Sequence, residues 1–361
     1  MKYVAQLDGV RFFAVVSVII AHWIVWDTSN EFVKSFPWSH GVILFFVLSG
    51  YLITSILLDV KQKVEAGEAN LKEALTNFYI RRVLRIFPVY YVTIIFLKLV
   101  DFKNVDELSP WLFTFSSNLY QAFTCKDAGQ FVHFWSLAIE EQFYLFWPLL
   151  ILTIRRSKIF KLMVVVMIFS VISRVLCFLL LNENWMLTSY FTLNLMMPLA
   201  LGGLIALLKS GLYNKLPNIF NRKELFYISG FVYFLFYYGV SKSGVKWIIP
   251  MFDEYLFALF AAFFIGNCAE SNFKYLAKAI LENKIVVYIG SISYGMYVYH
   301  MFVIDLYLNY VAVKLDIHTS LKYTFWIFYA IILVLLASIS YYLLERPLNG
   351  LKKYFPYYKV K

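Results

Sequence analysis

The chain has 361 residues, of which 61% are hydrophobic and only 15% are charged, and its mean hydropathy is +0.68. This apolar content exceeds what a water-soluble globular domain uses, so that class is excluded. The net charge of +11 does not indicate nucleic-acid binding, because the basic residues lie in short loops between apolar runs.

Apolar runs that are long enough to cross a membrane recur along the chain. A spanning helix needs about 20 mainly apolar residues, and lipid offers backbone groups no partners, so such runs predict a helical bundle. Ten of these runs lie at approximately 10–26, 41–59, 80–100, 134–154, 159–181, 190–208, 225–240, 254–269, 285–313 and 321–344. The predicted fold class is an all-α integral membrane protein with about ten transmembrane helices.

Lysine and arginine residues are distributed unevenly between alternate connecting segments. The segments on one side carry 22 of them and those on the other side carry 7. Because basic loops stay in the cytoplasm, this split predicts that both termini are cytoplasmic. We expect a single membrane domain over residues 1–361, with no soluble domain after the last span.

Residues 60–78 form the only long charged insertion on the predicted cytoplasmic side. Leu71, Leu75 and Phe78 recur there at helical spacing behind Asn70, and Glu73 takes the position of a capping box. This pattern predicts a short amphipathic helix on the inner membrane surface.

The first span carries two ionisable residues, which are costly in a membrane and are therefore functional candidates. Arg11 and His22 are eleven residues apart, so they share one helix face at a separation of roughly 16 Å. An intramembrane histidine can be a simple helix contact. The shared face instead favours a catalytic role for His22.

Two arginines lie on one face of the third span where it leaves the cytoplasm. Arg82 and Arg85 are at positions i and i+3, near a helix N-terminus whose dipole also attracts anions. This arrangement predicts a phosphate-binding site, and the alternative is a pair of positive-inside anchors. For Arg81 we favour the anchor.

Counting the helical rise from each span's edge places five polar residues at a similar depth, which predicts one shared water-accessible cavity. They are His22, Ser49, Glu140, Arg174 and His300. The adjacent Glu140 and Glu141 cannot share a helix face, so only one of them should line this cavity.

The remaining histidines are weaker candidates. His300 and Asp305 match an H-x4-D pattern, but a five-residue offset does not align them on a helix. His40, His133 and His318 lie in or near outer loops, where we expect them to be solvated or interfacial. The three cysteines have no metal-ligand or CxxC spacing, so we expect no metal site.

Six segments together carry a resemblance to a known family. They are LDGVRFFAVVSVIIAHW from Leu7, GVILFFVLSGYLI from Gly41, RRVLRIFPVYY from Arg81, FWSLAIEEQFYLFWPLL from Phe134, GSISYGMYVYHMFV from Gly290, and LLERPL near the end. In this order they resemble the acyltransferase-3 family of multi-pass membrane acyltransferases. The likeness extends over essentially the whole chain.

This resemblance implies residue roles and a reaction. The family's R-x10-H pair falls on Arg11 and His22, its R-x-x-R pair on Arg82 and Arg85, and its W-S-L-x-x-E segment on Glu140. It implies an acyl-CoA co-substrate, no tightly bound cofactor, and usually acetyl transfer to a glycan. Ile43 departs from the family pattern, because many relatives carry a polar residue there.

The resulting hypothesis is an O-acyltransferase in a bacterial cytoplasmic membrane, with acyl-CoA and a glycan or lipid-linked saccharide as partners. The arginines would hold the phosphates of coenzyme A, and His22 would act as general base with Glu140 holding its tautomer. An acyl-histidine intermediate is left open. The rival interpretation is a transporter or flippase, against which stands the lack of visible inverted repeats.

Overall fold

The computed structural model describes residues 3–25, 28–180, 185–212, 216–242, 248–307 and 322–358. Every regular element within these ranges is a helix, so the all-α class is confirmed. The first half contains α1 (Ala5–Ile20), a π-helical turn (Ala21–Val25), α2 (Glu31–Lys34), α3 (Gly41–Glu65), α4 (Leu71–Leu99), α5 (Val105–Phe113), α6 (Ser117–Thr124), α7 (Phe134–Thr153) and α8 (Ile159–Leu180). The second half contains α9 (Trp185–Tyr190), α10 (Met196–Lys209), α11 (Lys223–Lys242), α12 (Ile248–Ala269), α13 (Tyr275–Leu281), α14 (Lys284–Ser291), α15 (Ser293–Leu306), α16 (Lys322–Ser340) and α17 (Arg346–Gly350).

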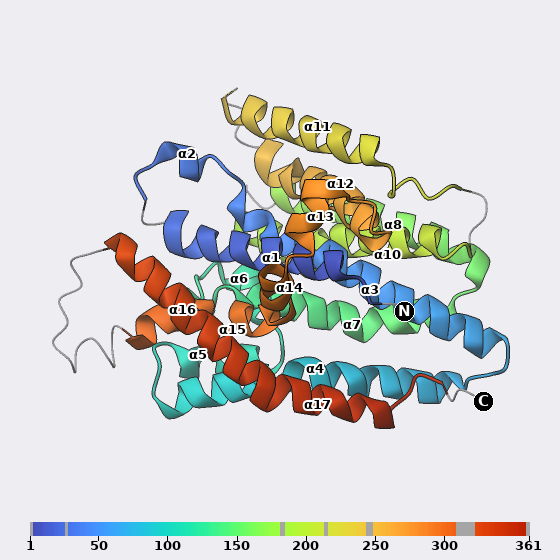
Figure 1. Ribbon diagram of the computed structural model, residues 1–361, viewed down its shortest axis with the longest axis horizontal. Coiled ribbons are helices and arrows are strands. Elements are labelled where there is room, and N and C mark those ends of the chain that lie inside the picture. The colour runs from blue at the N-terminus through green and yellow to red at the C-terminus, as the bar shows by residue number, and fades with distance from the viewer. Residues whose placement is uncertain are drawn as a thin grey trace.

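The long helices form a bundle whose middle is built by α3, α7 and α10 (Figure 1). At one edge α11 packs on α12, and at the opposite edge α17 packs on α4. The helix α3 contacts α10 more extensively than any other helix, and it also contacts α1 and α7. A central α3 explains why its residues appear in every cavity described below.

Two glycines allow α3 and α10 to approach backbone to backbone. A Cβ at Gly50 would lie 1.9 Å from the carbonyl oxygen of Leu199, and one at Gly202 would lie 2.0 Å from that of Val47. Small residues at such crossings are the usual means of close helix packing in membranes. The crossing fixes the position of α3 in the bundle.

Six helical segments in the described residues are long and apolar enough to cross a membrane, and a bent pair raises the number to seven. The count of about ten is therefore not confirmed. Three further expected spans, α4, α7 and α11, are helical but are not among these segments. In α4 the residues Arg81, Arg82 and Arg85 lower the apolar content.

The expected span 285–313 is broken within its described part. The helices α14 and α15 meet at a bend of 73°. Because of this bend, Ser293, Tyr294 and Tyr297 at the start of α15 face the interior of the bundle, where they line a cavity.

The segment at 60–78 differs from expectation. Asn70 caps a helix as predicted, because its Oδ1 accepts a hydrogen bond from the backbone N–H of Glu73 at 3.1 Å. That helix is not a separate surface helix, however, since α4 runs without interruption from Leu71 to Leu99. The apolar residues after Asn70 therefore form the first turns of a long helix.

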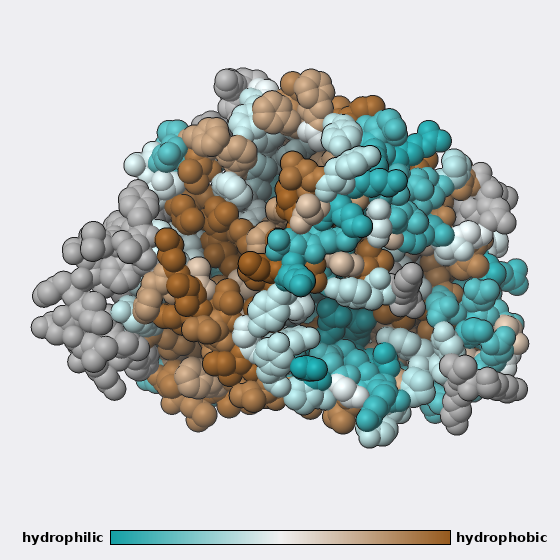
Figure 2. All heavy atoms as spheres, in the orientation of Figure 1, coloured by the Kyte–Doolittle hydropathy of each residue, from teal (hydrophilic) through white to brown (hydrophobic). Residues whose placement is uncertain are grey.

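One face of the molecule is divided by polarity (Figure 2). Hydrophobic residues gather around α16 on the left of this view, and hydrophilic residues gather on the right. Exposed apolar side chains on α16 include Ile327, Ile331, Leu335 and Ile339. A surface of this kind suits contact with lipid.

Candidate active site

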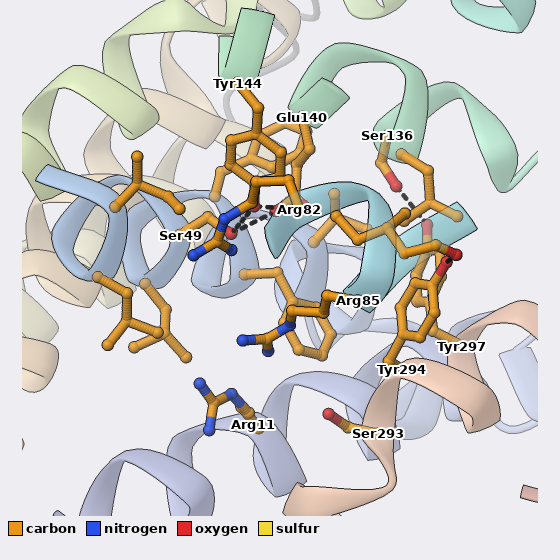
Figure 3. Close-up of a pocket in the computed structure, with 18 of the residues that line it drawn as sticks. Arg11, Ser49, Arg82, Arg85, Ser136, Glu140, Tyr144, Ser293, Tyr294 and Tyr297 are labelled. Atoms are coloured by element: carbon orange, nitrogen blue, oxygen red, sulfur yellow. Dashed lines mark hydrogen bonds between the residues drawn. The ribbon is translucent and has the colours of Figure 1, made fainter. Parts of the chain in front are cut away.

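Three arginines converge on one cavity of 210 Å³, which we call the arginine cavity (Figure 3). Arg11 reaches it from α1, and Arg82 and Arg85 reach it from successive turns of α4. Arg11 is paired with Asp8, one turn earlier on its own helix. In the part of the chain that the structure describes, no ion pair involves Arg82 or Arg85. Two guanidinium groups without an ion-pair partner, together with Arg11, make this cavity suited to an anion.

Tyr144 supports one of these cations. The guanidinium of Arg82 lies 5.4 Å from the ring centroid of Tyr144 and 5.4 Å from that of Phe78. Such cation–π contacts orient the guanidinium plane without consuming its hydrogen-bond donors. The Nε of Arg82 is buried without a hydrogen-bond partner.

Arg81 plays a different part from its neighbour. It donates hydrogen bonds to the carbonyl oxygens of Lys352 at 2.6 Å and Phe355 at 3.1 Å. Its guanidinium also lies 4.5 Å from the ring centroid of Tyr357. Arg81 therefore anchors the C-terminal segment against α4.

Glu140 faces the arginine cavity, and Glu141 does not line it. Ser49 donates a hydrogen bond to Glu140 Oε1 at 2.7 Å, and the Tyr144 hydroxyl donates to Glu140 Oε2 at 3.4 Å (Figure 3). These bonds hold the carboxylate in the same cavity as the arginines. Of the two adjacent glutamates, Glu140 is thus the one that lines the arginine cavity.

His22 lies on the π-helical turn that follows α1. Its Nδ1 lies 3.0 Å from Nε2 of His300, and Nδ1 of His300 lies 2.6 Å from the carbonyl oxygen of Tyr297. A π turn shifts the register of side chains and is frequent at functional sites. Here it occurs at the residue that meets α15.

This chain of contacts determines the tautomer of His22. The carbonyl of Tyr297 can only accept, so Nδ1 of His300 carries a hydrogen. In neutral His300 the other nitrogen, Nε2, is then an acceptor, and Nδ1 of His22 must donate to it. Neutral His22 is left with an unprotonated Nε2, which is the atom a general base needs.

His133 lies behind this pair and is fully buried, with 0% of its surface exposed. Its ring centroid is 4.8 Å from that of His300, and its Nε2 lies 3.2 Å from the carbonyl oxygen of Val298. The expectation of a solvated or interfacial His133 was wrong, because the start of α7 packs against α15. His40 is buried too, 2.9 Å from a carboxylate oxygen of Asp253, and His318 lies outside the described residues.

His22 lines a second cavity of 390 Å³, the histidine cavity, rather than the arginine cavity. Val42 and Tyr297 line both cavities and stand between them. The Tyr297 hydroxyl is held 2.6 Å from Ser136 Oγ and donates to the carbonyl of His133 at 2.8 Å. The two cavities therefore meet at a wall that hydrogen bonds keep in place.

The residues that were predicted to share one cavity are thus not all found in either of these two adjoining cavities. Ser49 and Glu140 line the arginine cavity, His22 lines the histidine cavity, and His300, Arg174 and Glu141 line neither. Glu140 does not hold the tautomer of His22, since His300 occupies that position. Similar depth did not imply a shared cavity, because side chains at one depth can leave their helices in different directions.

Arg174 does not lie in one cavity with Glu140, and Asp305 does not contact His300 as the H-x4-D pattern would require. Arg174 is buried and pairs with Glu254, whose side chain lines the histidine cavity. Asp305 does not bond His300, because both ring nitrogens of that histidine are engaged by His22 and Tyr297. Within the described ranges, no group of three His, Cys, Asp or Glu residues is placed to hold a metal ion.

Sequence reasoning did not assign several of these positions. Tyr297, Ser136 and Tyr144 were not predicted, although the first follows Gly290 in the segment GSISYGMYVYHMFV. Hydroxyl-bearing residues in an apolar, aromatic-rich span do not stand out by type. Two signals were available: Ser136 is the serine of the W-S-L-x-x-E segment, and Tyr294 and Tyr297 repeat at i and i+3.

The fold and the two cavities describe a multi-pass membrane protein in which a cavity lined by three arginines adjoins a cavity lined by a histidine. The sequence profile described as "Acyltransferase domain" matches residues 4–345, and the chain belongs to this family. The apolar helices and the bacterial origin of its relatives indicate a multi-pass bacterial membrane protein.

Several bacterial proteins that are named as O-acetyltransferases are similar to this chain. "O-acetyltransferase OatA" of Staphylococcus aureus (strain NCTC 8325 / PS 47) is 29% identical over 96% of this chain and 57% of its own length. "Putative peptidoglycan O-acetyltransferase YrhL" of Bacillus subtilis (strain 168) is 27% identical over 96% of this chain and 55% of its own length. A "Putative O-acetyltransferase" of Staphylococcus aureus (strain COL) is 29% identical over 86% and 52%. The chain thus spans about half the length of these relatives. No solved structure matches it.

Proposed function

We propose that this protein transfers an acetyl group from cytoplasmic acetyl-CoA to a hydroxyl of an extracytoplasmic or lipid-linked cell-envelope glycan. Membership of the acyltransferase family and the names of the relatives support this reaction class. The single observation that carries the proposal is the contact series from the Tyr297 carbonyl through His300 to Nδ1 of His22, which leaves Nε2 of the cavity-lining His22 free to act as a base.

The donor enters through the arginine cavity. Phosphate groups of coenzyme A bind the guanidinium groups of Arg82 and Arg85, which form no ion pair in the described residues, with Arg11 beside them. From there the thioester arm extends toward Val42 and Tyr297, which border both cavities. The acetyl carbonyl then lies within reach of the histidine cavity.

The acceptor hydroxyl reacts on the His22 side. Nε2 of His22 takes the hydroxyl proton while the oxygen attacks the thioester carbonyl carbon. The new C–O bond forms, the C–S bond breaks, and the proton passes from His22 to the departing thiolate. The products are an acetyl ester and coenzyme A as its thiol.

The test is the substitution His22→Ala. General-base catalysis supplies about 10² to 10⁴ in rate, so acetyl transfer should fall by at least the lower factor. The side chain lines a cavity, so its loss creates no new closed void, and we expect the protein to stay folded although His300 loses a hydrogen-bond partner at a cost of ~1–3 kcal/mol. The measurement is transfer of labelled acetyl groups in membranes, normalised to folded protein, beside coenzyme A affinity.

Two results would contradict the proposal. Near wild-type transfer by His22→Ala would show that His22 is not the base. Wild-type protein that moves saccharide across vesicle membranes without consuming acetyl-CoA would favour the transporter instead.

A further inference from the structure

The histidine cavity is lined by a row of three aromatic rings. The ring centroid of Tyr190 lies 5.4 Å from that of Trp135 and 5.9 Å from that of Trp185. All three residues line the cavity, and Trp185 is 55% exposed. The row therefore runs from the interior, where Trp135 packs on Phe46, to the surface. An exposed tryptophan at a cavity mouth offers a flat apolar face to a ligand.

A buried hydrogen-bond acceptor, on Gln121, lines the same cavity as these rings. Gln121 is fully buried at the cavity wall, and its Nε2 donates to the carbonyl oxygens of Ser117 and Val132. Its Oε1 has no hydrogen-bond partner. A buried acceptor without a partner carries a free-energy cost that a bound hydroxyl group removes.

Two carboxylates complete the polar side of the cavity. Asp127 is exposed, and Glu254 is held by the buried Arg174. The guanidinium of Arg174 compensates the charge of Glu254, and the charge of Asp127 is exposed to water, so the cavity holds no buried uncompensated carboxylate that would call for a cationic ligand. The cavity therefore presents hydrogen-bond acceptors beside flat apolar rings. This combination matches a neutral molecule that has many hydroxyl donors and one apolar ring face.

We propose that the histidine cavity is the saccharide-binding site of this protein. One sugar ring stacks on Trp185 and Tyr190 and donates hydroxyl hydrogens to Gln121 and Asp127, with another hydroxyl directed at His22. This inference rests on the proposed function for the role of the bound hydroxyl, but the binding itself does not depend on catalysis.

Saccharide binding by purified protein in detergent, without donor, is the first measurement. Chitooligosaccharide and maltooligosaccharide are titrated while tryptophan fluorescence is followed. We expect Trp185→Ala to raise the dissociation constant of the bound oligosaccharide about tenfold, equivalent to ~1.4 kcal/mol, and Trp185→Phe to restore part of it. Trp185 is largely exposed, so its replacement should not unfold the protein. Trp111→Leu is the matched control, because that tryptophan is only partly buried and lines neither cavity.

Acetyl-CoA hydrolysis without saccharide is the second measurement, and it separates the two proposals. Weakened saccharide binding with unchanged hydrolysis in Trp185→Ala supports the site. Equal saccharide affinity in Trp185→Ala and wild type, or no binding of either oligosaccharide by wild type, overturns the site even where hydrolysis persists. Absence of hydrolysis and transfer in wild type overturns the proposed function, whereas a binding loss confined to Trp185→Ala still supports the saccharide site.

Discussion

At the scale of single residues, His300 has the most specific geometry, because it lies between the Tyr297 carbonyl and His22. It lines neither cavity, so we treat it as a positioning residue. Loss of a buried hydrogen-bond partner costs ~1–3 kcal/mol, which corresponds to about fivefold to 150-fold in rate. We expect His300→Ala to lower kcat by this factor with the KM for acetyl-CoA unchanged.

The glutamine variant makes this test specific. The side-chain oxygen of His300→Gln can still accept from His22, so we expect partial recovery of kcat. A merely structural histidine would show equal losses in both variants, together with reduced thermal stability. Measuring kcat, KM and thermal unfolding in detergent for each variant separates these outcomes.

The two unpaired arginines support a prediction about the donor. A phosphate contact made equally in the ground state and the transition state changes KM more than kcat. Charge-assisted hydrogen bonds are worth ~1.5–3 kcal/mol, so Arg82→Ala or Arg85→Ala should raise the KM for acetyl-CoA about tenfold or more. Lysine should restore only part of this loss if the contact is bidentate.

Lys98→Ala is the control for these variants. Lys98 is on the same helix, but its side chain is exposed and pairs with Asp106 away from the cavity. An unchanged dependence of rate on acetyl-CoA concentration in both arginine variants would remove the phosphate-binding role.

At the scale of helices, the crossing of α3 and α10 determines where the walls of both cavities lie. A side chain at Gly202 would meet the backbone of Val47, which cannot move aside as a flexible side chain can. We expect Gly202→Ala to lower the free energy of unfolding by about 1–3 kcal/mol. The measurement is thermal unfolding in detergent, together with activity.

Gly239→Ala provides the matched control on α11. A Cβ there has no atom within 4 Å, and alanine favours a helix. Its stability should be equal to or above that of wild type. Equal stability of both variants would show that α3 and α10 do not depend on this contact.

At the scale of the whole molecule, the distribution of basic residues predicts the orientation in the membrane. Segments expected on one side hold 22 lysines and arginines and those on the other hold 7, so both termini should be cytoplasmic. A reporter fused after Lys361 should be active only in its cytoplasmic form. Activity of a periplasmic reporter at that position would reverse the orientation and place the arginine cavity on the wrong side for a cytoplasmic donor.

Features that depend on residues close together in the chain could be predicted from the sequence by itself. The apolar runs predicted helices, Asn70 predicted a helix start, and the i, i+3 spacing placed Arg82 and Arg85 on one face. Local hydropathy and helical period decide these features, and they do not depend on how helices pack. The assignment to the class of membrane proteins and the shared face of Arg82 and Arg85 follow from local hydropathy and helical period.

Only the tertiary structure decided which distant residues meet. His22 and His300 are 278 residues apart in the chain, and the bend between α14 and α15 together with the π turn at Ala21–Val25 brings their rings into contact. The pairing of Arg174 with Glu254 and the wall at Tyr297 arise in the same way. A sequence gives the depth of a residue in its own helix, but the rotation and crossing of each helix result from the packing of all the others. Those rotations separated the arginines and the histidine into two cavities.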